Sequence, residues 1–474
     1  MSAQEYDVIV IGAGPVGENV ADRAVQGGLT AVIVEAELVG GECSYWACMP
    51  SKALLRPAEA LAAARAVAGS AEAVTGELDI SAVLRRRTEF THDWDDAGQV
   101  EWLTSAGIDL VRGHGRISGV REVTVTAGDR TDVVLTARHA VAVCTGTSAL
   151  VPDVPGLAEI SPWTSREATS ADHVPASLTV IGGGVVGVEM ATLYAALGSQ
   201  VTMVAPSGIL PRMEPFVGER VTASLRDAGV VFAASRPASA HLGVEGRTVV
   251  LTDGTEITSD EVLVATGRRP RTSDLGLTAL GVSGVSDDDW IPVDDTMLVP
   301  GTDWLYAVGD VNHRALLTHQ GKYQARAAGD VIAARAHGRP VDGAAWGAHV
   351  ATADHAAVPQ VVFSHPPVGS VGQTAHEAEA AGVRTRVVDY DLGSVAGAAT
   401  FADGYAGHAR MIVDEDRGVV IGATLIGPGV EEMVHAATIA VVGEVPLARL
   451  WHAVPSYPTI SEVWLRLLEA YGRP

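Results

Sequence analysis

Two glycine-rich turns, each placed between an apolar run and a helical pattern, constrain the fold of this 474-residue chain more than any other feature. The first apolar run, at 6–11, leads into the turn 12–17 (Gly-Ala-Gly-Pro-Val-Gly), and a helical pattern continues to about Gly27. A second apolar run at 31–34 ends in Glu35. A strand, a Gly-x-Gly-x-x-Gly turn, a helix and a second strand ending in an acid are typical of a Rossmann unit that binds a dinucleotide.

The same pattern recurs in the middle of the chain. An apolar run at 177–181 leads into the turn 182–187 (Gly-Gly-Gly-Val-Val-Gly), a helical pattern continues to about Leu197, and another apolar run occupies 200–204. Two matches in the same strand–turn–helix–strand context are far harder to obtain by chance than one. The sequence therefore predicts two Rossmann-like domains, each with its own dinucleotide.

The residues that follow the last strand of the second unit indicate which nucleotide this unit binds. Where an NAD-binding unit carries an acid for the ribose 2′-hydroxyl, this chain has Ala205, followed by Pro206 and Ser207. No carboxylate there repels a 2′-phosphate, so NADPH is favoured over NADH, with Ser207 as a candidate contact. The nearest arginine is Arg212, and both nucleotides stay open.

Two of the three cysteines stand close together just after the first unit, in a segment that continues Cys-Met-Pro-Ser-Lys. Cys43 and Cys48 are five positions apart and can be joined in a small ring if the helical turn between them is distorted. At a helix N-terminus such a pair has a lowered thiol pKa and cycles readily between disulfide and dithiol. Two buried structural thiols are the alternative. Cys144, inside an apolar strand, is expected in the core.

Composition narrows the class of protein. The chain has 57 Asp plus Glu against 33 Lys plus Arg, a net charge of −24, which disfavours the phosphate backbone of a nucleic acid as a partner. Three cysteines are too few for a disulfide-stapled secreted protein, and no leader or transmembrane pattern is found. We therefore expect a cytoplasmic protein that binds neither nucleic acid nor membrane. The histidines show no metal-ligand spacing, so no metal site is predicted.

The two dinucleotide units and the Cys-x4-Cys-x-Pro-Ser-Lys segment between them resemble the pyridine nucleotide-disulfide oxidoreductases. These are the flavoproteins that include dihydrolipoamide dehydrogenase, glutathione reductase and mercuric reductase. The resemblance implies an α/β fold with two Rossmann-like βαβ dinucleotide-binding domains and a C-terminal α+β dimerisation domain. The expected boundaries are 1–150 for the FAD-binding domain, 151–270 for the NAD(P)-binding domain, 271–345 for a central domain that returns to the FAD domain, and 346–474 for the dimerisation domain.

The resemblance also implies roles for particular residues. FAD would be bordered by Gly12, Gly14, Gly17, Glu35, His114, Gly115, Thr145, Gly146 and Asp310. NAD(P)H would be lined by Gly182, Gly184, Gly187 and Gly267. Lys52, one of only two lysines in the chain, would lie beside the flavin ring and pair with Glu189. Hydride would pass from NAD(P)H to the flavin and electrons on to the disulfide, with Cys48 facing the flavin and Cys43 attacking the substrate.

The C-terminal part departs from the family pattern. Disulfide reductases of the family carry His-Pro-Thr-x-Ser-Glu, whose histidine protonates the departing thiolate, but this chain has Tyr457 there, with Glu462 retained. Tyrosine has a reference pKa of about 10 against about 6.5 for histidine, which makes it a poor proton shuttle at neutral pH. His452 is an alternative donor if its loop folds back. Mercuric reductases also have tyrosine at this position, but they end in a cysteine pair that this chain lacks.

Three functions stay open. The first is an FAD-dependent oxidoreductase that reduces a disulfide or another electrophilic acceptor through Cys43 and Cys48. Its other catalytic candidates are Lys52, Glu189, Tyr457 and Glu462. The second is an NAD(P)H oxidase or quinone reductase whose flavin reduces the acceptor directly, which the missing histidine favours. The third is a redox-sensing or carrier flavoprotein with little turnover. By resemblance, a homodimer completes the active site.

Overall fold

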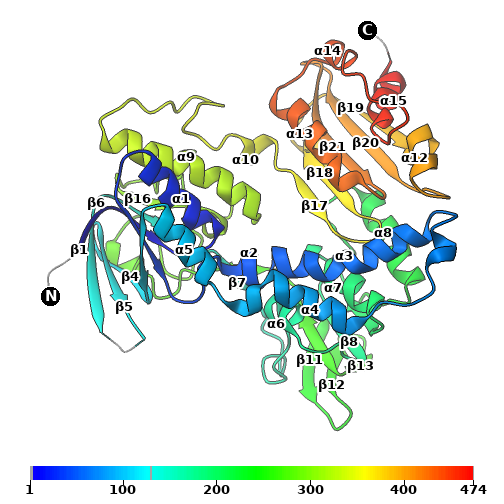
Figure 1. The fold of residues 1–474 in the computed structure, drawn as a ribbon, viewed down its shortest axis with the longest axis horizontal. Coiled ribbons are helices and arrows are strands. Elements are labelled where there is room, and N and C mark those ends of the chain that lie inside the picture. Colours follow the sequence, from blue (N-terminus) through cyan, green and yellow to red (C-terminus); the bar gives the residue numbers. More distant parts are fainter. Residues whose placement is uncertain (1–3, 129–130, 473–474) are drawn as a thin grey trace. The chain divides into compact units, whose positions relative to one another are not determined.

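The computed structural model describes residues 4–128 and 131–472, which fall into two compact units (Figure 1). Each unit is assembled from three separate stretches of the chain. The first unit consists of 1–50, 88–149 and 268–354, and the second of 51–87, 150–267 and 355–474. No helix in the described residues is long and apolar enough to cross a bilayer.

A mixed sheet forms the centre of the first unit, with the strand order β3-β2-β1-β6-β5-β4 and with β16 paired to β6. The strands β1, β2, β3, β6 and β16 run parallel to one another, whereas β4 and β5 join as antiparallel neighbours. The strands are β1 (Gln4–Ile11), β2 (Ala31–Glu35), β3 (Ile108–Arg112), β4 (His114–Gly119), β5 (Glu122–Thr126), β6 (Asp132–Val143) and β16 (Leu305–Ala307). A short antiparallel pair joins β7 (Thr147–Ala149) to β15 (Arg268–Pro270).

Two helices, α1 (Pro15–Gln26) and α9 (Thr318–Ala336), lie side by side in the first unit (Figure 1). Proline at the first position of α1 suits a helix start, because its missing N–H is not needed there. Glycine and alanine at the contact let the two backbones approach closely: a Cβ on Gly329 would lie 2.5 Å from the Cβ of Arg23. The shorter helices are α2 (Gly41–Tyr45) and α5 (Ala97–Ser105).

Three helices contain residues of both units, namely α3 (Cys48–Arg65), α4 (Ile80–Phe90) and α10 (Ala353–Ala356).

In the second unit, a parallel sheet has the order β10-β9-β8-β14. Its strands are β8 (Ser177–Ile181), β9 (Gln200–Val204), β10 (Val231–Ala233) and β14 (Glu261–Val264). An antiparallel sheet is formed by β11 (Pro237–Leu242), β12 (Arg247–Leu251) and β13 (Glu256–Ser259). The accompanying helices are α6 (Ser165–Ser170), α7 (Val185–Ala196) and α8 (Pro215–Asp227).

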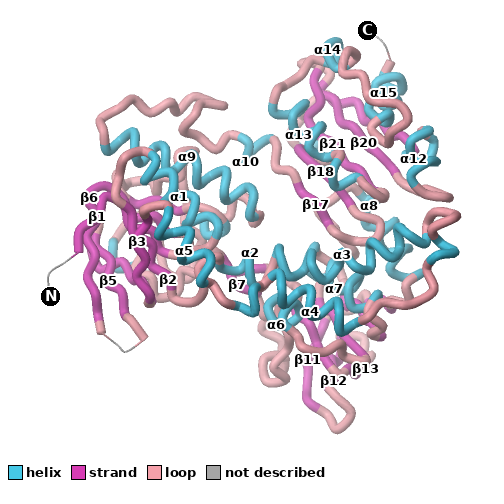
Figure 2. The backbone as a smooth tube through the Cα atoms, viewed as in Figure 1, coloured by secondary structure: helices cyan, strands magenta, loops and turns pink. Residues whose placement is uncertain are grey.

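The chain ends in a five-stranded antiparallel sheet of order β17-β18-β21-β20-β19 (Figure 2). Helix α13 packs on β18 and β21, and α15 packs on β19 and β20. The strands are β17 (Gln360–Val362), β18 (Val368–Gly372), β19 (Thr385–Asp391), β20 (His408–Asp414) and β21 (Val419–Ile426). The helices are α11 (Ala375–Ala380), α12 (Ala396–Phe401), α13 (Val434–Val442), α14 (Leu447–Leu450) and α15 (Glu462–Tyr471).

The predicted fold class is confirmed: two Rossmann-like βαβ units, β1–α1–β2 and β8–α7–β9, precede a C-terminal α+β domain. The second half of β1 is apolar because both of its faces are covered, and Val8, Ile9 and Val10 are completely buried. The segment after β15 returns to the first sheet through β16, whose Leu305 pairs with Val141 of β6.

Candidate active site

The first glycine turn connects β1 to α1 in a geometry that only glycine allows. Gly12 has φ of 104°, and a Cβ there would lie 2.5 Å from the carbonyl oxygen of Cys144. A Cβ on Gly17 would lie 1.9 Å from the carbonyl oxygen of Gly12, whereas the space around Gly14 is open to 4 Å. The turn therefore exposes backbone N–H groups at the start of α1, which is where the pyrophosphate of a dinucleotide binds.

Glu35 at the end of β2 is held against this turn. Its Oε2 accepts a 2.6 Å hydrogen bond from the N–H of Ala13, and its Oε1 accepts a 2.7 Å bond from the N–H of Glu37. The carboxylate is thus oriented beside the glycine turn, in the place where a Rossmann acid binds ribose hydroxyls.

A second group of FAD candidates lies where β6 and β16 end. Desolvation raises the pKa of the half-buried Asp310 carboxyl, which accepts a 2.7 Å hydrogen bond from the hydroxyl of Thr147. Arg268 holds the same threonine through bonds of 2.5 and 2.8 Å. The buried hydroxyl of Thr145 has no partner in the described structure, and Gly146 adopts φ of 70°. A buried hydroxyl without a partner among the described residues and a half-buried acid beside an open glycine turn fit FAD, whose ribityl and phosphate groups offer hydrogen-bond partners.

His114 and Gly115 begin β4. A Cβ on Gly115 would lie 2.9 Å from Val34 Cγ1, so the backbone of β4 approaches the end of β2 closely. The exposed imidazole of His114 lies 3.7 Å from Asp274. The glycine is therefore placed beside the FAD candidates, while the histidine side chain faces an acid at the surface.

The structure brings the two candidate redox cysteines within hydrogen-bond distance as thiols that are not joined in a disulfide. Cys43 lies in α2, and Cys48 is the first residue of the 18-residue helix α3, where the helix dipole favours a thiolate. The Sγ of Cys48 lies 3.2 Å from the Oγ1 of Thr318, the first residue of α9. A hydrogen bond to Cys48, together with burial, raises the pKa of the Cys43 thiol.

Lys52 follows Cys48 by one helical turn on α3. Its Nζ lies 2.8 Å from Oε2 of Glu189 on α7, whose side chain is only 6% exposed. The ammonium also lies 4.8 Å from the centroid of the Phe363 ring. The pairing implied by the family resemblance is therefore present in the second unit.

The second glycine turn repeats the geometry of the first. A Cβ on Gly187 would lie 2.2 Å from the carbonyl oxygen of Gly182, and the space around Gly184 is open to 4 Å. Gly267, after β14, has φ of 143°. Ser207 is exposed beyond the end of β9. These residues leave the N-terminus of α7 accessible to a dinucleotide.

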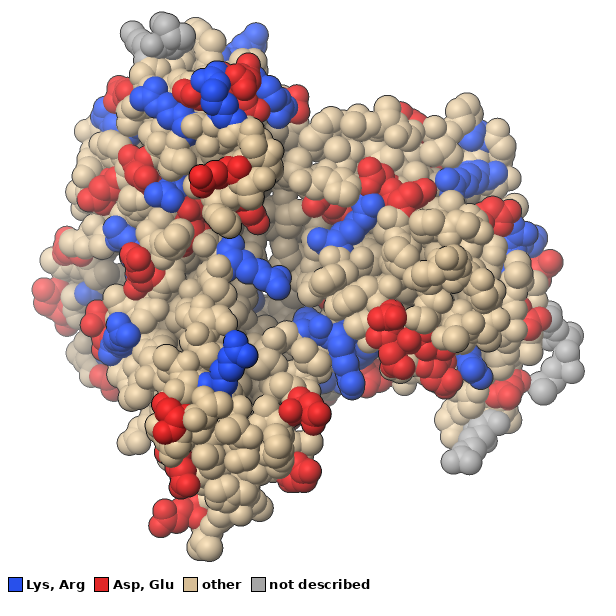
Figure 3. Space-filling model, turned by 180° about the vertical axis from the view of Figure 1, so that it is seen from behind, with Lys and Arg blue, Asp and Glu red and all other residues tan. Residues whose placement is uncertain are grey.

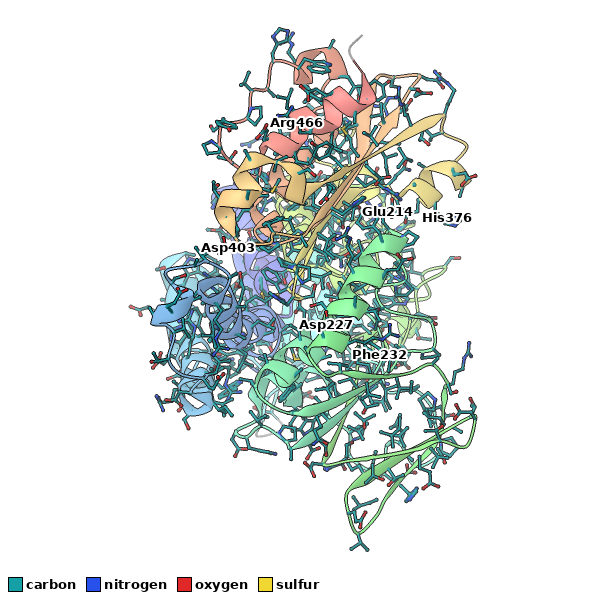
Figure 4. All side chains as sticks on the ribbon, turned by 90° about the vertical axis from the view of Figure 1, so that its right-hand side faces the viewer. Glu214, Asp227, Phe232, His376, Asp403 and Arg466 are labelled. Carbon is teal, nitrogen blue, oxygen red and sulfur yellow. The ribbon has the colours of Figure 1, made fainter. Side chains whose placement is uncertain are left out.

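No hydrogen bond joins Tyr457 to Glu462 within this chain. Tyr457 is 75% exposed, and its hydroxyl has no hydrogen-bond partner among the described residues. Glu462 begins α15, is buried, and pairs with Arg466 one turn further along, labelled in Figure 4. The neighbouring His452 is exposed as well. Within one chain, the glutamate is therefore engaged by an arginine and does not brace a proton donor.

Sequence reasoning missed three residues of the first unit, namely Thr318, Lys322 and Glu18. Thr318 contacts Cys48, and the ammonium of Lys322 acts to lower the pKa of the Cys43 thiol. A signal for Lys322 was available, because it is the only lysine besides Lys52. Thr318 and Glu18 carry no comparable signal in the sequence.

Charge on the surface is mixed. On the face drawn in Figure 3, Lys and Arg side chains lie scattered among Asp and Glu and form no continuous stripe. In the described residues, no group of three or more His, Cys, Asp or Glu side chains is arranged to hold a metal ion.

Comparison with protein families identifies the class to which this fold and these cysteines belong. The model of the pyridine nucleotide-disulphide oxidoreductases matches residues 6–336, and the model of their dimerisation domain matches residues 358–467. The chain belongs to this family, and the resemblance seen in the sequence is confirmed. It is a flavoprotein oxidoreductase of the disulfide reductase type, and the family uses FAD and NAD(P)H.

Individual relatives cover nearly the whole chain. It is 32% identical to the dihydrolipoyl dehydrogenase of Haloferax volcanii, over 98% of this chain and 95% of that protein. It is 31% identical to the mercuric reductase of Acidithiobacillus ferrooxidans, over 97% of this chain and 81% of that protein. The solved structure of the HOCl-induced flavoprotein disulfide reductase RclA from Escherichia coli has the same fold, with a TM-score of 0.82 at 23% identity, covering 98% of this chain and 99% of that one.

Proposed function

We propose that this protein passes electrons from NAD(P)H through bound FAD to the Cys43–Cys48 disulfide, and from there to a disulfide or another electrophilic acceptor. The observation that carries the proposal is the position of the cysteine pair, with Cys48 at the start of α3 and 3.2 Å from Thr318 at the start of α9. Two helix N-termini beside one sulfur favour its thiolate form.

The residues that would hold FAD are the first glycine turn, Glu35, and the Thr145–Asp310 region. When bound, FAD accepts a hydride from NAD(P)H and supplies an electron pair that reduces the disulfide. Since Glu35 is already oriented by the N–H of Ala13, its carboxylate needs little rearrangement to accept from a ribose hydroxyl. In the second unit, the buried carboxylate of Glu189 holds the Lys52 ammonium in a defined position.

Cys43 is the nucleophile in this proposal, and Cys48, whose thiolate form the two helix N-termini favour, is the sulfur that re-forms the disulfide. The Cys43 thiolate attacks one sulfur of the acceptor disulfide, a Cys43–sulfur bond forms, and the acceptor S–S bond breaks. The first leaving thiolate takes up the proton that Cys43 has lost. The Cys48 thiolate then attacks Cys43, re-forms the Cys43–Cys48 disulfide and releases the second thiolate, so that two electrons have passed to the acceptor.

We further propose NADPH as the preferred donor, since Ala205 leaves no carboxylate at the end of β9 to repel a 2′-phosphate. The match to a dimerisation domain supports a homodimer whose C-terminal sheet contributes to the interface. A cytoplasmic location remains part of the proposal.

Direct reduction of a quinone or of oxygen is the second candidate, and one observation favours it. The exposed Tyr457 is not braced by Glu462, which pairs with Arg466. A site without a neutral-pH proton donor is less suited to releasing thiols than to passing electrons to a quinone.

Steady-state oxidation of NADPH and NADH by a panel of disulfides and quinones tests the proposal. We expect Cys43→Ala to abolish disulfide turnover, while Cys144→Ala, which changes the buried third cysteine, leaves it within about twofold of the unmodified protein. If Cys43→Ala left quinone turnover intact and no disulfide were ever reduced, direct reduction would be the function. Absence of turnover with every small acceptor would favour a sensor or carrier.

A further inference from the structure

Helices α1 and α9 pack side by side and run in the same direction. A Cβ on Gly321 would lie 2.6 Å from Val16, and a Cβ on Gly27 would lie 2.4 Å from the Cβ of Ala333. Between these contacts, Arg23 pairs with Asp330 at 2.6 Å. Each of these residues in or just after α1 therefore faces a residue of α9 whose number is higher by 305 to 307.

With this offset, Glu18 of α1 lies at about the same height along the helix pair as Lys322 of α9. The Oε1 of Glu18 is buried and has no hydrogen-bond partner in the described structure. Burial raises the pKa of Glu18 to about 7, the nearby Glu35 adds to the rise, and Lys322 opposes it. Burial, Asp96 and Glu18 raise the pKa of the Tyr45 phenol on α2, so this phenol is a further titratable group that interacts with the carboxylate. Glu18 therefore changes charge near neutral pH.

Lys322 acts electrostatically on both the Glu18 carboxylate and the cysteine pair. It lies one turn after Thr318, which contacts Cys48, and its ammonium acts to lower the pKa of the Cys43 thiol. In the parts of the chain that the structure describes, no carboxylate oxygen lies within 4 Å of its Nζ. Cys48, Thr318 and Lys322 are the groups with the largest effects on the pKa of the Cys43 thiol, and of these three Lys322 carries the positive charge.

We propose that Lys322 supplies the positive charge that lets the Cys43 sulfur react as a thiolate, and that Glu18 determines how much of that charge the sulfur receives. The inference deepens the proposed function and rests on Cys43 being its nucleophile. Neither Lys322 nor Glu18 forms or breaks a covalent bond in the reaction. Both act through the electric field at the Cys43 sulfur.

The direction of the effect follows from charge. With Glu18 neutral, the field of Lys322 acts fully on the sulfur; with Glu18 ionised, part of that field is cancelled. An opposite charge close to a partly buried group shifts its titration by about 1 pH unit or more. Removing Lys322 should therefore shift Cys43 titration upward, whereas neutralising Glu18 should shift it downward.

The test is the pH dependence of Cys43 alkylation by iodoacetamide in the reduced, FAD-bound protein under anaerobic conditions, measured by peptide mass spectrometry. We expect Lys322→Met to raise the apparent alkylation midpoint by about 1 pH unit, so that alkylation below the midpoint slows about tenfold. Lys322→Arg should restore the original midpoint. Glu18→Gln should lower the midpoint, and should have no effect in a Lys322→Met background.

Asp330→Asn is the matched control, because it changes a charge on the same helix two turns beyond Lys322 and should leave the Cys43 midpoint unchanged. An unchanged midpoint in Lys322→Met, or an equal effect of Glu18→Gln with and without Lys322, would overturn this inference alone. Failure of Cys43 to be alkylated at any pH in the unmodified reduced protein would overturn its role as nucleophile, and this inference with it.

Discussion

Oε2 of Glu189 accepts a 2.8 Å bond from the ammonium of Lys52, and Oε1 accepts a 3.1 Å bond from the N–H of Phe363. One buried carboxylate therefore joins α3, α7 and the segment after β17. Burying a carboxylate is costly unless its oxygens are paired. The Lys52–Glu189 pair therefore links these three segments of the second unit.

Removing the lysine should destabilise the fold. We expect Lys52→Met to lower the free energy of unfolding by about 2 kcal/mol, because it leaves a buried charge with one oxygen unpaired, although partial exposure of Lys52 limits the loss. Glu189→Gln keeps the acceptor for Phe363 and should cost less, about 1 kcal/mol. Urea unfolding followed by tryptophan fluorescence measures both. Equal stability of Lys52→Met and the unmodified protein would contradict this account of the pair.

Substitutions in the two glycine turns should impair the binding of two different nucleotides. Gly17→Ala places a methyl group 1.9 Å from the Gly12 carbonyl oxygen, so the protein should purify without flavin absorbance. Gly187→Ala creates a contact of 2.2 Å with the Gly182 carbonyl oxygen in the other unit, so flavin should be retained while reduction by NADPH slows by about 100-fold or more. Each variant is the control for the other. Loss of flavin in both would show that neither turn is specific for one nucleotide.

Nucleotide preference should depend on position 205. Ala205→Glu places a carboxylate at the end of β9, where it repels a 2′-phosphate and can accept from a 2′-hydroxyl. We expect kcat/KM for NADPH to fall by about tenfold or more while that for NADH is kept or rises. Stopped-flow reduction of the flavin by each nucleotide measures this ratio. A parallel fall for both nucleotides would show that the change disturbs the fold rather than selectivity.

The exposed tyrosine should be dispensable, and histidine should improve on it. Tyr457→Phe removes an exposed hydroxyl that has no hydrogen-bond partner among the described residues, so disulfide turnover should change less than about twofold. Tyr457→His adds an imidazole that titrates near neutrality and should raise disulfide turnover at pH 7 by about tenfold or more. Steady-state rates between pH 6 and 9 measure both. A loss of about 100-fold in Tyr457→Phe would instead make the tyrosine an essential proton donor.

Glu18 should make the protein less stable as pH rises. Its pKa is raised from 4.5 in the unfolded chain to about 7 in the fold, so between these pH values the folded state binds more protons, and the free energy of unfolding falls as pH increases. Glu18→Gln should therefore stabilise the protein at pH 8, by at most about 3 kcal/mol, and change little at pH 4. Urea unfolding at the two pH values measures the difference. The exposed Glu219→Gln on α8 is the control and should show no such pH dependence.

Several parts of the candidate site follow from local sequence. The turns at 12–17 and 182–187 predicted two Rossmann units, because a strand and a helix can meet so tightly only where Cβ atoms are missing. The five-residue spacing of Cys43 and Cys48 predicted a close pair, because neighbouring residues in the chain cannot lie far apart. The Lys52–Glu189 pair was expected only through resemblance to a family.

Tertiary structure decided which distant residues act on those cysteines. Thr318 lies 270 positions after Cys48, and Lys322 and Glu18 reach the same neighbourhood only because α9 packs in register along α1. It also decided that Glu462 pairs with Arg466 rather than with Tyr457. Local patterns determine strands, turns and the spacing of thiols, whereas burial and the field at a sulfur depend on packing between segments that are remote in the chain.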